Sequence, residues 1–372
     1  MKENIFIPPV IKSREYLISK TKSHKTQGIP ITKTGTTYNL AQQTRWLSNN
    51  NFAVGRWDGT MSIFNYSSEP FTGPKLTAAV NSPSSGGVQM ITYIPSHMMI
   101  TSNNDRSLSV WITSSDDWSD LKLETIESYD SSLDVATNGV WFPSLLDNDP
   151  STLVVGHYSG FVSIWSVDHH HKKLNFIEKI DLRNPNPVNP FNAHAMYGMC
   201  ILKEKGPDAS VICGSDDGYI SIVEVHTRKT VSQTVFNPDA QRGINSISVF
   251  RNKLLVANCS VGMNDKNLWY FDIDLETSEI SYRDSMNLLI DKNRIQSFNF
   301  DVEWGEYSSG LCWFAGTEEG VLWMGKANEK LELIGYESLS ESSIGAALAF
   351  TNRPGRLAAA IHNIDQFSTG SE

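Results

Sequence analysis

Short apolar runs alternate with small polar residues along most of the chain, and one pattern recurs six times. Each copy has an apolar run, a turn rich in Gly, Asp or Asn, and an alternating run that in several copies ends in an aromatic residue. Strands with one buried face alternate in this way, and Asp-Gly or Glu-Gly steps favour tight turns. Each copy therefore predicts a β-hairpin, at 52–64, 99–111, 153–165, 211–223, 254–272 and 313–324.

Further apolar runs precede the hairpins, and more polar alternating runs follow several of them. The preceding runs, with a seventh after the last hairpin, are at 44–47, 88–93, 139–142, 197–202, 244–250, 295–300 and 344–350. The following runs are at 121–128, 174–182, 229–236 and 331–336. A strand covered on both faces is apolar throughout, whereas a strand at the outer edge of a sheet carries polar residues. The sequence therefore predicts repeated sheets of four antiparallel strands, each with an apolar first strand and a solvent-facing fourth strand.

Several hairpin residues resemble those of the WD-repeat family. Trp111 and Trp165 end their third strands, where the family often has tryptophan, and Ala193-His194 approximates the Gly-His that precedes a first strand. Turn aspartates are present at Asp58, Asp105 and Asp217. The chain departs from the family in that no third strand of these hairpins ends in Trp-Asp, and Ser159 replaces one turn aspartate. The resemblance implies a β-propeller, whose four-stranded blades surround a central channel, with a hydrogen-bonded set of His, Ser or Thr, Asp and Trp in a blade.

With seven apolar first strands, we expect an all-β, seven-bladed β-propeller that forms one domain over residues 1–372. Its seventh blade is incomplete at the C-terminal end, where 356–362 predicts a second strand. Closed propellers leave only short, protected sheet edges. We therefore expect strands within 1–22, at 5–8 and 15–19, to complete this blade and close the ring. Residues 23–38 predict a loop, and residues 39–372 the seven blades.

The composition is typical of a folded, acidic protein. The formal net charge is −10, and nonspecific nucleic-acid binding needs clustered positive charge, so we expect no direct nucleic-acid partner. The four cysteines are widely spaced and form no CxxC motif, which predicts reduced thiols in the core. No signal peptide or membrane-spanning run is found. We expect an intracellular protein, cytoplasmic or nuclear, with no membrane insertion.

Large aromatic and cationic residues lie in the predicted turns between second and third strands. A tight polar turn gives such side chains little to pack against, and exposed Trp, Tyr and Arg are typical anchors of protein interfaces. The connection at 183–194 contains three prolines, which hold it extended; it either presents Phe191 to a partner or serves only to connect two strands. The predicted partner-binding residues are Arg56, Trp57, Arg106, His157, Tyr158, Tyr219 and Phe191.

Carboxylates also lie in these turns, and two interpretations of them stay open. They either form an acidic ring that binds a cation or a basic peptide, or they bind their own backbone amides. The residues concerned are Asp58, Asp105, Asp216, Asp217, Glu318 and Glu319.

No catalytic motif lies on a suitable element: the chain has no GxSxG, HExxH, Walker or Rossmann pattern there. The charged residues in and beside the predicted first strands are Arg45, Asp301 and Glu303, which are too few and too scattered to define a reaction. We therefore predict that the protein is not an enzyme and uses no cofactor.

Three consecutive histidines, His169, His170 and His171, either bind a transition metal or belong to a polar loop. Neighbouring residues on an extended chain point apart, so the sequence favours the loop, and we predict no metal site. His194 is predicted to be a structural histidine, hydrogen-bonded across a blade.

These features predict a non-catalytic scaffold or adaptor subunit that holds one or more protein partners in a hetero-complex. One alternative is a propeller enzyme or small-ligand sensor, which needs several charged side chains converging at the channel mouth. Another alternative is a reader of modified peptides, which needs three aromatic side chains around one pocket.

Overall fold

The computed structural model describes residues 41–48, 50–65, 75–84, 86–145, 149–184, 194–237, 242–261, 265–289, 296–307, 310–318, 321–338, 346–350 and 357–361. Within these ranges the chain consists of β-strands, turns and one 3-10 turn, η1 (Ser131–Leu133). No helix among the same residues is long and apolar enough to cross a membrane.

The strands pair antiparallel with their neighbours in sequence, and the first sixteen form four sheets of four. The first sheet contains β1 (Ala41–Trp46), β2 (Asn51–Arg56), β3 (Thr60–Asn65) and β4 (Lys75–Asn81). The second contains β5 (Ile91–Ile94), β6 (Met98–Asn103), β7 (Ser107–Ile112) and β8 (Lys122–Ser128). The third contains β9 (Ala136–Phe142), β10 (Ser151–His157), β11 (Phe161–Asp168) and β12 (Lys173–Asp181). The fourth contains β13 (Met196–Lys203), β14 (Ser210–Ser215), β15 (Tyr219–Glu224) and β16 (Lys229–Val235).

The remaining strands continue the pattern with one irregularity. The next four are β17 (Ile244–Phe250), β18 (Lys253–Val261), β19 (Leu268–Ile273) and β20 (Ile280–Met286). They are followed by β21 (Gln296–Tyr307), β22 (Gly310–Thr317), β23 (Val321–Ala327) and β24 (Leu331–Ser338). The end of β18 also pairs with β21, which joins these two groups into one sheet. The last pair is β25 (Ala346–Phe350) with β26 (Leu357–Ile361).

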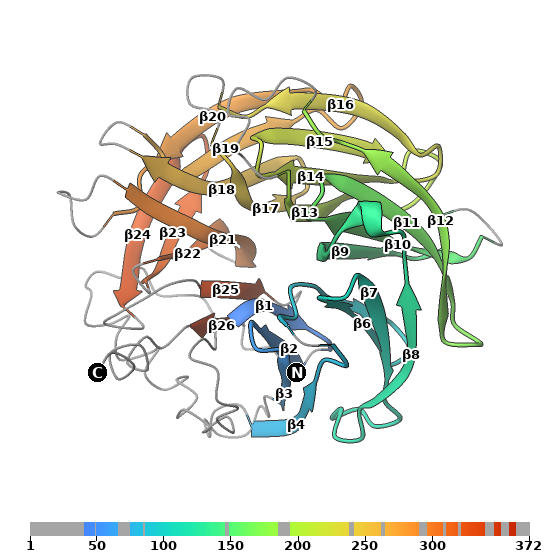
Figure 1. The fold of residues 1–372 in the computed structure, drawn as a ribbon. Helices are drawn as coiled ribbons and strands as arrows, with labels where there is room; N and C mark the ends of the chain where they lie inside the picture. Colours follow the sequence, from blue (N-terminus) through green and yellow to red (C-terminus); the bar gives the residue numbers. More distant parts are fainter. Residues whose placement is uncertain are drawn as a thin grey trace, which may run out of the picture.

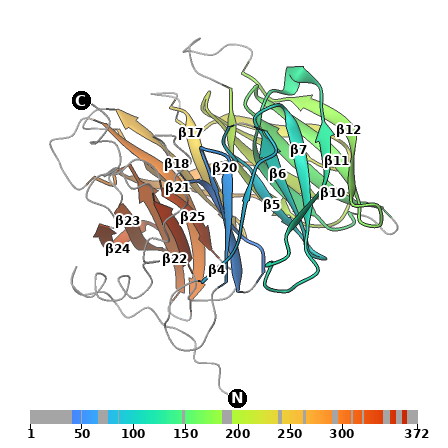
Figure 2. The same cartoon turned by 60° about the horizontal axis from the view of Figure 1, so that its bottom comes forward.

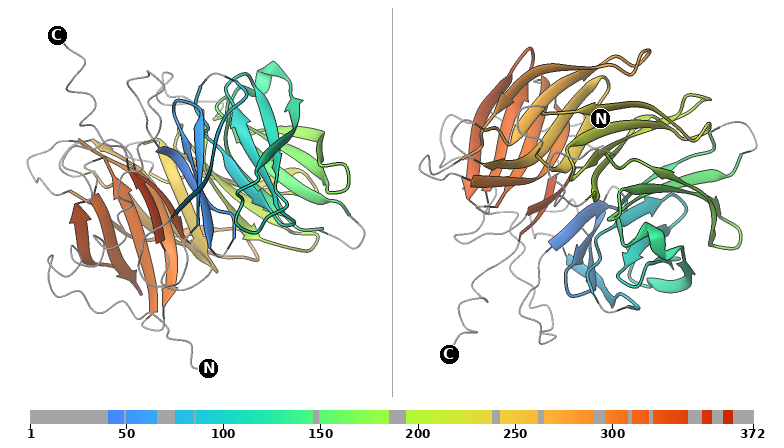
Figure 3. Two further views of the ribbon diagram at one scale, coloured as in Figure 1. Left: turned by 90° about the horizontal axis from the view of Figure 1, so that it is seen from below. Right: turned by 45° about the horizontal axis from the view of Figure 1, so that its top comes forward.

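The sheets are arranged around a common centre (Figure 1). The first strands of the sheets lie nearest the centre, and the fourth strands lie at the periphery. The turned views show the sheets face to face with their neighbours (Figures 2 and 3). Burial follows the same order, because β10 is buried along its whole length whereas β12 is largely exposed.

The structure confirms the prediction of an all-β chain built from four-stranded antiparallel sheets. All six predicted hairpins form, and each predicted first strand overlaps an observed strand. Strand β25 contacts both β1 and β21, so it lies between the first and the last four-strand groups. The predicted N-terminal strands at 5–8 and 15–19 and the loop at 23–38 lie outside the described residues.

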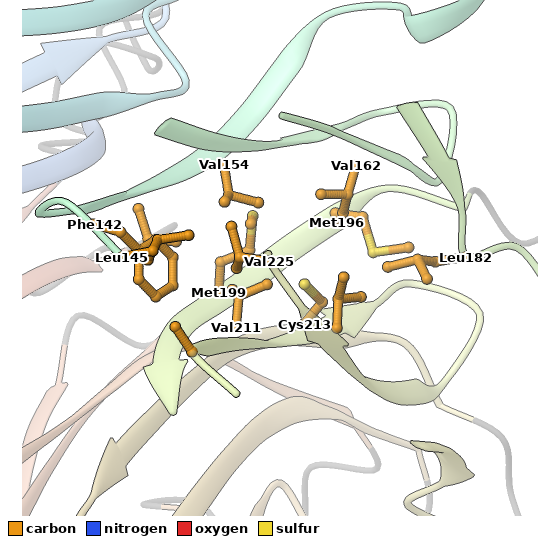
Figure 4. Close-up of a cluster of buried hydrophobic side chains, with 13 residues drawn as sticks. Phe142, Leu145, Val154, Val162, Leu182, Met196, Met199, Val211, Cys213 and Val225 are labelled. Atoms are coloured by element: carbon orange, nitrogen blue, oxygen red, sulfur yellow. The ribbon is translucent and has the colours of Figure 1, made fainter. Parts of the chain in front are cut away.

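The hydrophobic core consists of separate layers, each between two neighbouring sheets. In the layer between the third and fourth sheets, Val154 and Val162 face Met199 and Cys213 (Figure 4). Similar clusters lie between the first and second, second and third, and fourth and fifth groups of strands. The fold is therefore stabilised mainly by sheet-on-sheet burial of apolar side chains.

Glycines in the second strands allow neighbouring sheets to approach closely. A Cβ atom on Gly156 would lie 2.6 Å from Met199 Sδ, and one on Gly214 would lie 2.6 Å from Ile244 Cγ2. Both distances are shorter than any ordinary contact, so the neighbouring first strand occupies the space that a side chain needs. Gly156 and Gly214 are thus required because the next sheet packs too closely for a side chain at these positions.

Polar side chains also join one first strand to the next. Each donates to a backbone carbonyl of the following sheet, which satisfies an acceptor that the sheet itself leaves open. The bonds run from Arg45 Nε to Ile91 O (3.2 Å), Asn138 Nδ2 to Tyr197 O (2.6 Å), Cys200 Sγ to Ile247 O (3.0 Å) and Asn245 Nδ2 to Asn299 O (2.8 Å).

Replacing Gly214 by alanine tests the close approach. The added Cβ forces the fourth sheet away from Ile244, and overpacking of this kind typically costs about 1–3 kcal/mol of unfolding free energy. Chemical denaturation followed by intrinsic fluorescence measures the change. Thr234→Ala, on the exposed side of β16, is the control and should change stability by less than about 0.5 kcal/mol. Equal stability of both variants would contradict the packing argument.

A candidate interaction face at the strand turns

The turns between second and third strands lie beside the entries to the first strands. Backbone bonds join the two: Tyr158 N donates to Val135 O (2.8 Å), and Asp216 N donates to Ala195 O (2.9 Å). Glu318 N similarly donates to a carbonyl of β21. We call the surface formed by these turns and strand entries the turn face. Its backbone is fixed by hydrogen bonds, so side chains on it project from a rigid base.

Two large aromatic side chains are exposed on the turn face. Trp57 follows β2 and has 50% of its surface exposed, and Tyr158 follows β10 and has 41% exposed. Arg106 is also exposed, and its Nε lies 3.3 Å from Asp134 Oδ1. Tyr219, at the start of β15, is half-buried. Phe191, the remaining aromatic of the predicted set, lies outside the described residues.

The expectation that Arg56 is a surface contact is wrong, because only 7% of it is exposed. Its Nη1 donates to Ser62 Oγ at 2.9 Å across the hairpin. Burial lowers the pKa of Arg56 to about 10, and the nearby charge of Asp58 opposes that shift. Arg56 therefore supports the turn from inside while the neighbouring Trp57 projects outward.

His157 is also buried, and its prediction as a contact residue is likewise wrong. Its Nδ1 lies 3.2 Å from Asp134 O, and a carbonyl only accepts, so Nδ1 carries the proton. The unprotonated Nε2 then accepts from Ser163 Oγ at 2.6 Å, and Trp165 Nε1 donates to the same oxygen at 2.8 Å. Burial lowers the pKa of His157 to about 4, which keeps the ring neutral. The histidine thus fixes the turn that presents Tyr158.

One signal in the sequence identifies these buried polar positions. Each of the first four hairpins has a serine in its third strand on the inward face, and all four serines are buried. An inward serine needs a polar partner, and in the first three hairpins the second strand supplies it six residues earlier. The pairs are Arg56 with Ser62, Asn103 with Ser109, and His157 with Ser163. Arg56 and His157 were therefore wrongly predicted to be at the surface because the prediction used only their position next to a turn.

His194 has the structural position predicted for it. Its Nδ1 lies 2.8 Å from Asp217 Oδ2, and the side chain of Asp217 is almost fully buried. Asn184 N donates to the same oxygen at 3.0 Å, and the Ser215 hydroxyl donates to Asp217 Oδ1. The carboxylate thus joins both ends of the 184–194 connection to the turn of the fourth sheet. Asp217 therefore bonds to residues of its own turn and of the neighbouring connection, as the local interpretation of the turn aspartates expects.

Five first strands contain a β-bulge where they meet the turn face. The register with the second strand shifts by one residue at each of these places. The extra residues are Gln42, Thr137, Tyr197, Asn245 and Phe300. A bulge redirects one side chain away from the ordinary alternation of a strand. Sequence reasoning missed these positions because a single inserted residue barely disturbs the apolar pattern.

The three charged residues of the first strands lie closer together than the sequence suggested. Burial raises the pKa of Glu303 to about 8, Asp301 adds to the rise, and Arg45 opposes it. Ser248 Oγ donates to Glu303 Oε2 at 3.1 Å. Burial also raises the pKa of Cys200 to about 12, so this thiol is not an activated nucleophile. The group forms a polar inner wall in which one carboxyl is held protonated near neutral pH.

The histidine run at 169–171 does not converge on one point. His169 Nε2 lies 2.6 Å from Ser151 Oγ, whereas His171 Nδ1 lies 2.8 Å from Asp168 Oδ2. Within the part of the chain that the structure describes, no three His, Cys, Asp or Glu side chains are grouped so as to hold a metal ion.

Comparison with known proteins supports the architecture. No protein-family model matches the chain, and no curated protein sequence is similar to it. Among solved structures, the chain is similar to the crystal structure of the Cps50 (Swd1) β-propeller domain from Myceliophteria thermophila. The TM-score is 0.59 at 13% identity, over 86% of this chain and 93% of that chain. The fold is a β-propeller. At this identity the similarity establishes the fold of the propeller alone.

The buried His157 predicts a loss of stability in acid. Its folded pKa is about 4 and its ordinary value is 6.5, so between these values the unfolded chain binds more protons. The unfolding free energy should fall as pH drops from 6.5 to 4, by roughly 2–4 kcal/mol for this residue. Urea denaturation at several pH values measures it. The loss should be smaller in His157→Gln and unchanged in the control Thr234→Ala; an equal loss in all three proteins would contradict the assignment.

Glu303 predicts the opposite dependence on pH. Its folded pKa is about 8 and its ordinary value is 4.5, so between these values the folded protein binds more protons. Its contribution to stability should therefore fall as pH rises from 4.5 to 8. Allowing for solvent screening of a partly exposed side chain, Glu303→Gln should be more stable than wild type at pH 8 by about 1 kcal/mol or more. The difference between the two denaturation curves should vanish near pH 4.5, and a constant difference at all pH values would contradict the raised pKa.

Proposed function

We propose that the protein is a non-catalytic scaffold that binds one or more protein partners through the turn face. The observation that carries the proposal is the exposure of Trp57 and Tyr158, at 50% and 41%, on turns fixed by backbone bonds. Exposed aromatic side chains on a rigid base lose little conformational freedom on binding, and Trp and Tyr are common interface anchors. The proposed contact set is Trp57, Arg106, Tyr158 and Tyr219, with Phe191 of the neighbouring connection.

We further propose that the ring has seven blades, with β25 and β26 as inner strands of the seventh. The contacts of β25 with both β1 and β21 support this arrangement. A closed ring suits a scaffold, because its sheets have few free edges and its turn face offers several separate contact points. The predicted strands in 1–22 would then supply the outer part of the seventh blade.

Affinity purification from native cells with quantitative mass spectrometry tests the proposed role. The bait is the full chain, compared with a Trp57→Ala, Tyr158→Ala double variant. Because a few central aromatic residues carry most of the energy of an interface, we expect at least roughly a tenfold loss of a stoichiometric partner.

The matched control for this experiment is Phe176→Ala, Tyr282→Ala. These aromatic residues are similarly exposed, at 47% and 56%, but lie on the outer strands β12 and β20. The control should retain the partner. Equal recovery from both double variants, with both folded by circular dichroism, would contradict the turn-face proposal.

A further inference from the structure

The edges that remain in the ring include the fourth strands of the sheets, which lie at the periphery (Figure 1). Each pairs with a third strand on one side, and no strand of the described residues pairs with its other side. A free edge presents a row of unpaired N–H and C=O groups, to which a strand of another molecule can bond. The strands concerned are β4, β8, β12, β16, β20 and β24.

Each of these fourth strands contains one extra residue, where its register with the third strand shifts by one. The shift lies between the fourth and fifth residues of the third strand in five sheets, and between the third and fourth residues of β19. Because the strands differ in sequence, the repeated position indicates a common physical requirement. The extra residues are Thr77, Glu124, Ile177, Val231, Arg283 and Ile334.

The packing between sheets does not need the extra residue. In the fourth sheet, Thr230 pairs with Val223, which is buried against the third sheet. The next pair is Ser232 with Ile222, which is buried toward the fifth group of strands. Without Val231, Thr230 and Ser232 would be consecutive and would still point to opposite faces, as the alternation of a strand requires. The extra residue therefore acts on the free edge and on the twist of the strand.

Some of these edges would pair readily if they were regular. The six residues of β16 after its first lysine carry no charge and include two valines and two threonines. In β12, Phe176 and Ile177 are 47% and 37% exposed. Uncharged segments of high β propensity on an exposed edge are typical sites of aggregation. A bulge interrupts the row of edge groups and increases the local twist, so that a second strand cannot pair along the edge.

We propose that the extra residue in each fourth strand prevents the outer edge of the ring from pairing with the same edge of a second copy of the protein. The inference does not depend on the proposed scaffold function, but it agrees with it, since a ring with blocked outer edges binds its partners through its faces. The alternative is that the bulge serves only to twist the sheet. Removal of the extra residue leads to association of copies in the first case and only to a loss of stability in the second.

Deletion of Val231 from the full chain tests the proposal, because it makes β16 a regular edge strand. Size-exclusion chromatography with light scattering measures the molecular mass over roughly the micromolar to millimolar range. The mean mass of the deletion variant should rise at least about twofold with concentration, whereas wild type should stay monomeric. Hydrogen exchange should show protection of the β16 amides at high concentration in the deletion variant alone.

Two further variants are the controls. Val231→Ala changes the side chain but keeps the extra residue, so it should remain monomeric. Thr234→Lys, added to the deletion variant, places a charge on the exposed side of β16. It should restore the monomer, because lysine on an edge strand opposes pairing.

Deletion of Ile177 repeats the test on β12, in a different sheet. A deletion variant that is folded by circular dichroism and stays monomeric over the whole range would overturn the inference. Equal association of Val231→Ala, or association that Thr234→Lys does not reduce, would also overturn it. If neither deletion variant folds, the extra residue is needed within the sheet itself and the proposed role at the edge is wrong.

Discussion

Close packing of each sheet against the first strand of the next is the constraint on which the rest of the structure depends. At Gly156 and Gly214 the neighbouring first strand occupies the space of a side chain, with hypothetical Cβ contacts of 2.6 Å. Close-packed interiors respond to the addition of even one methyl group. The separation of the sheets, and with it the path of the first strands around the centre, is therefore determined at these contacts.

The turn face is fixed by this packing. Gly156 and Gly214 are each the last residue but one of their strand and precede a buried polar residue, so the sheet contact lies close to the turn and helps to place it. Buried side chains such as His157 and Asp217 then hold the turns and connections with hydrogen bonds. Exposed Trp57 and Tyr158 consequently project from positions that have little freedom to adapt. Binding of a partner to these side chains would therefore cost little conformational entropy on this surface.

Local patterns in the sequence predicted the strands well, because alternation and Gly or Asp turns are properties of a few adjacent residues. Thus Leu153–Trp165 predicted the β10–β11 hairpin without any knowledge of its neighbours. Whether a side chain in a turn is buried or exposed was harder to predict, because it depends on the strand opposite. Arg56 and His157 were expected at the surface, yet each is buried against a serine six residues later. The bulge at Tyr197 and its approach to Tyr158 come from different sheets, so no local pattern predicts them.

Hydroxyl-radical footprinting of the protein, alone and in complexes captured from native cells, tests the central claim that the turn face is the binding surface. The account predicts that the oxidation rates of Trp57 and Tyr158 fall several-fold in the complex, as expected for side chains that become desolvated anchors. Phe176 and Tyr282, exposed on outer strands, should oxidise at the same rate in both states. Protection of the outer strands with unchanged rates at Trp57 and Tyr158 would contradict it.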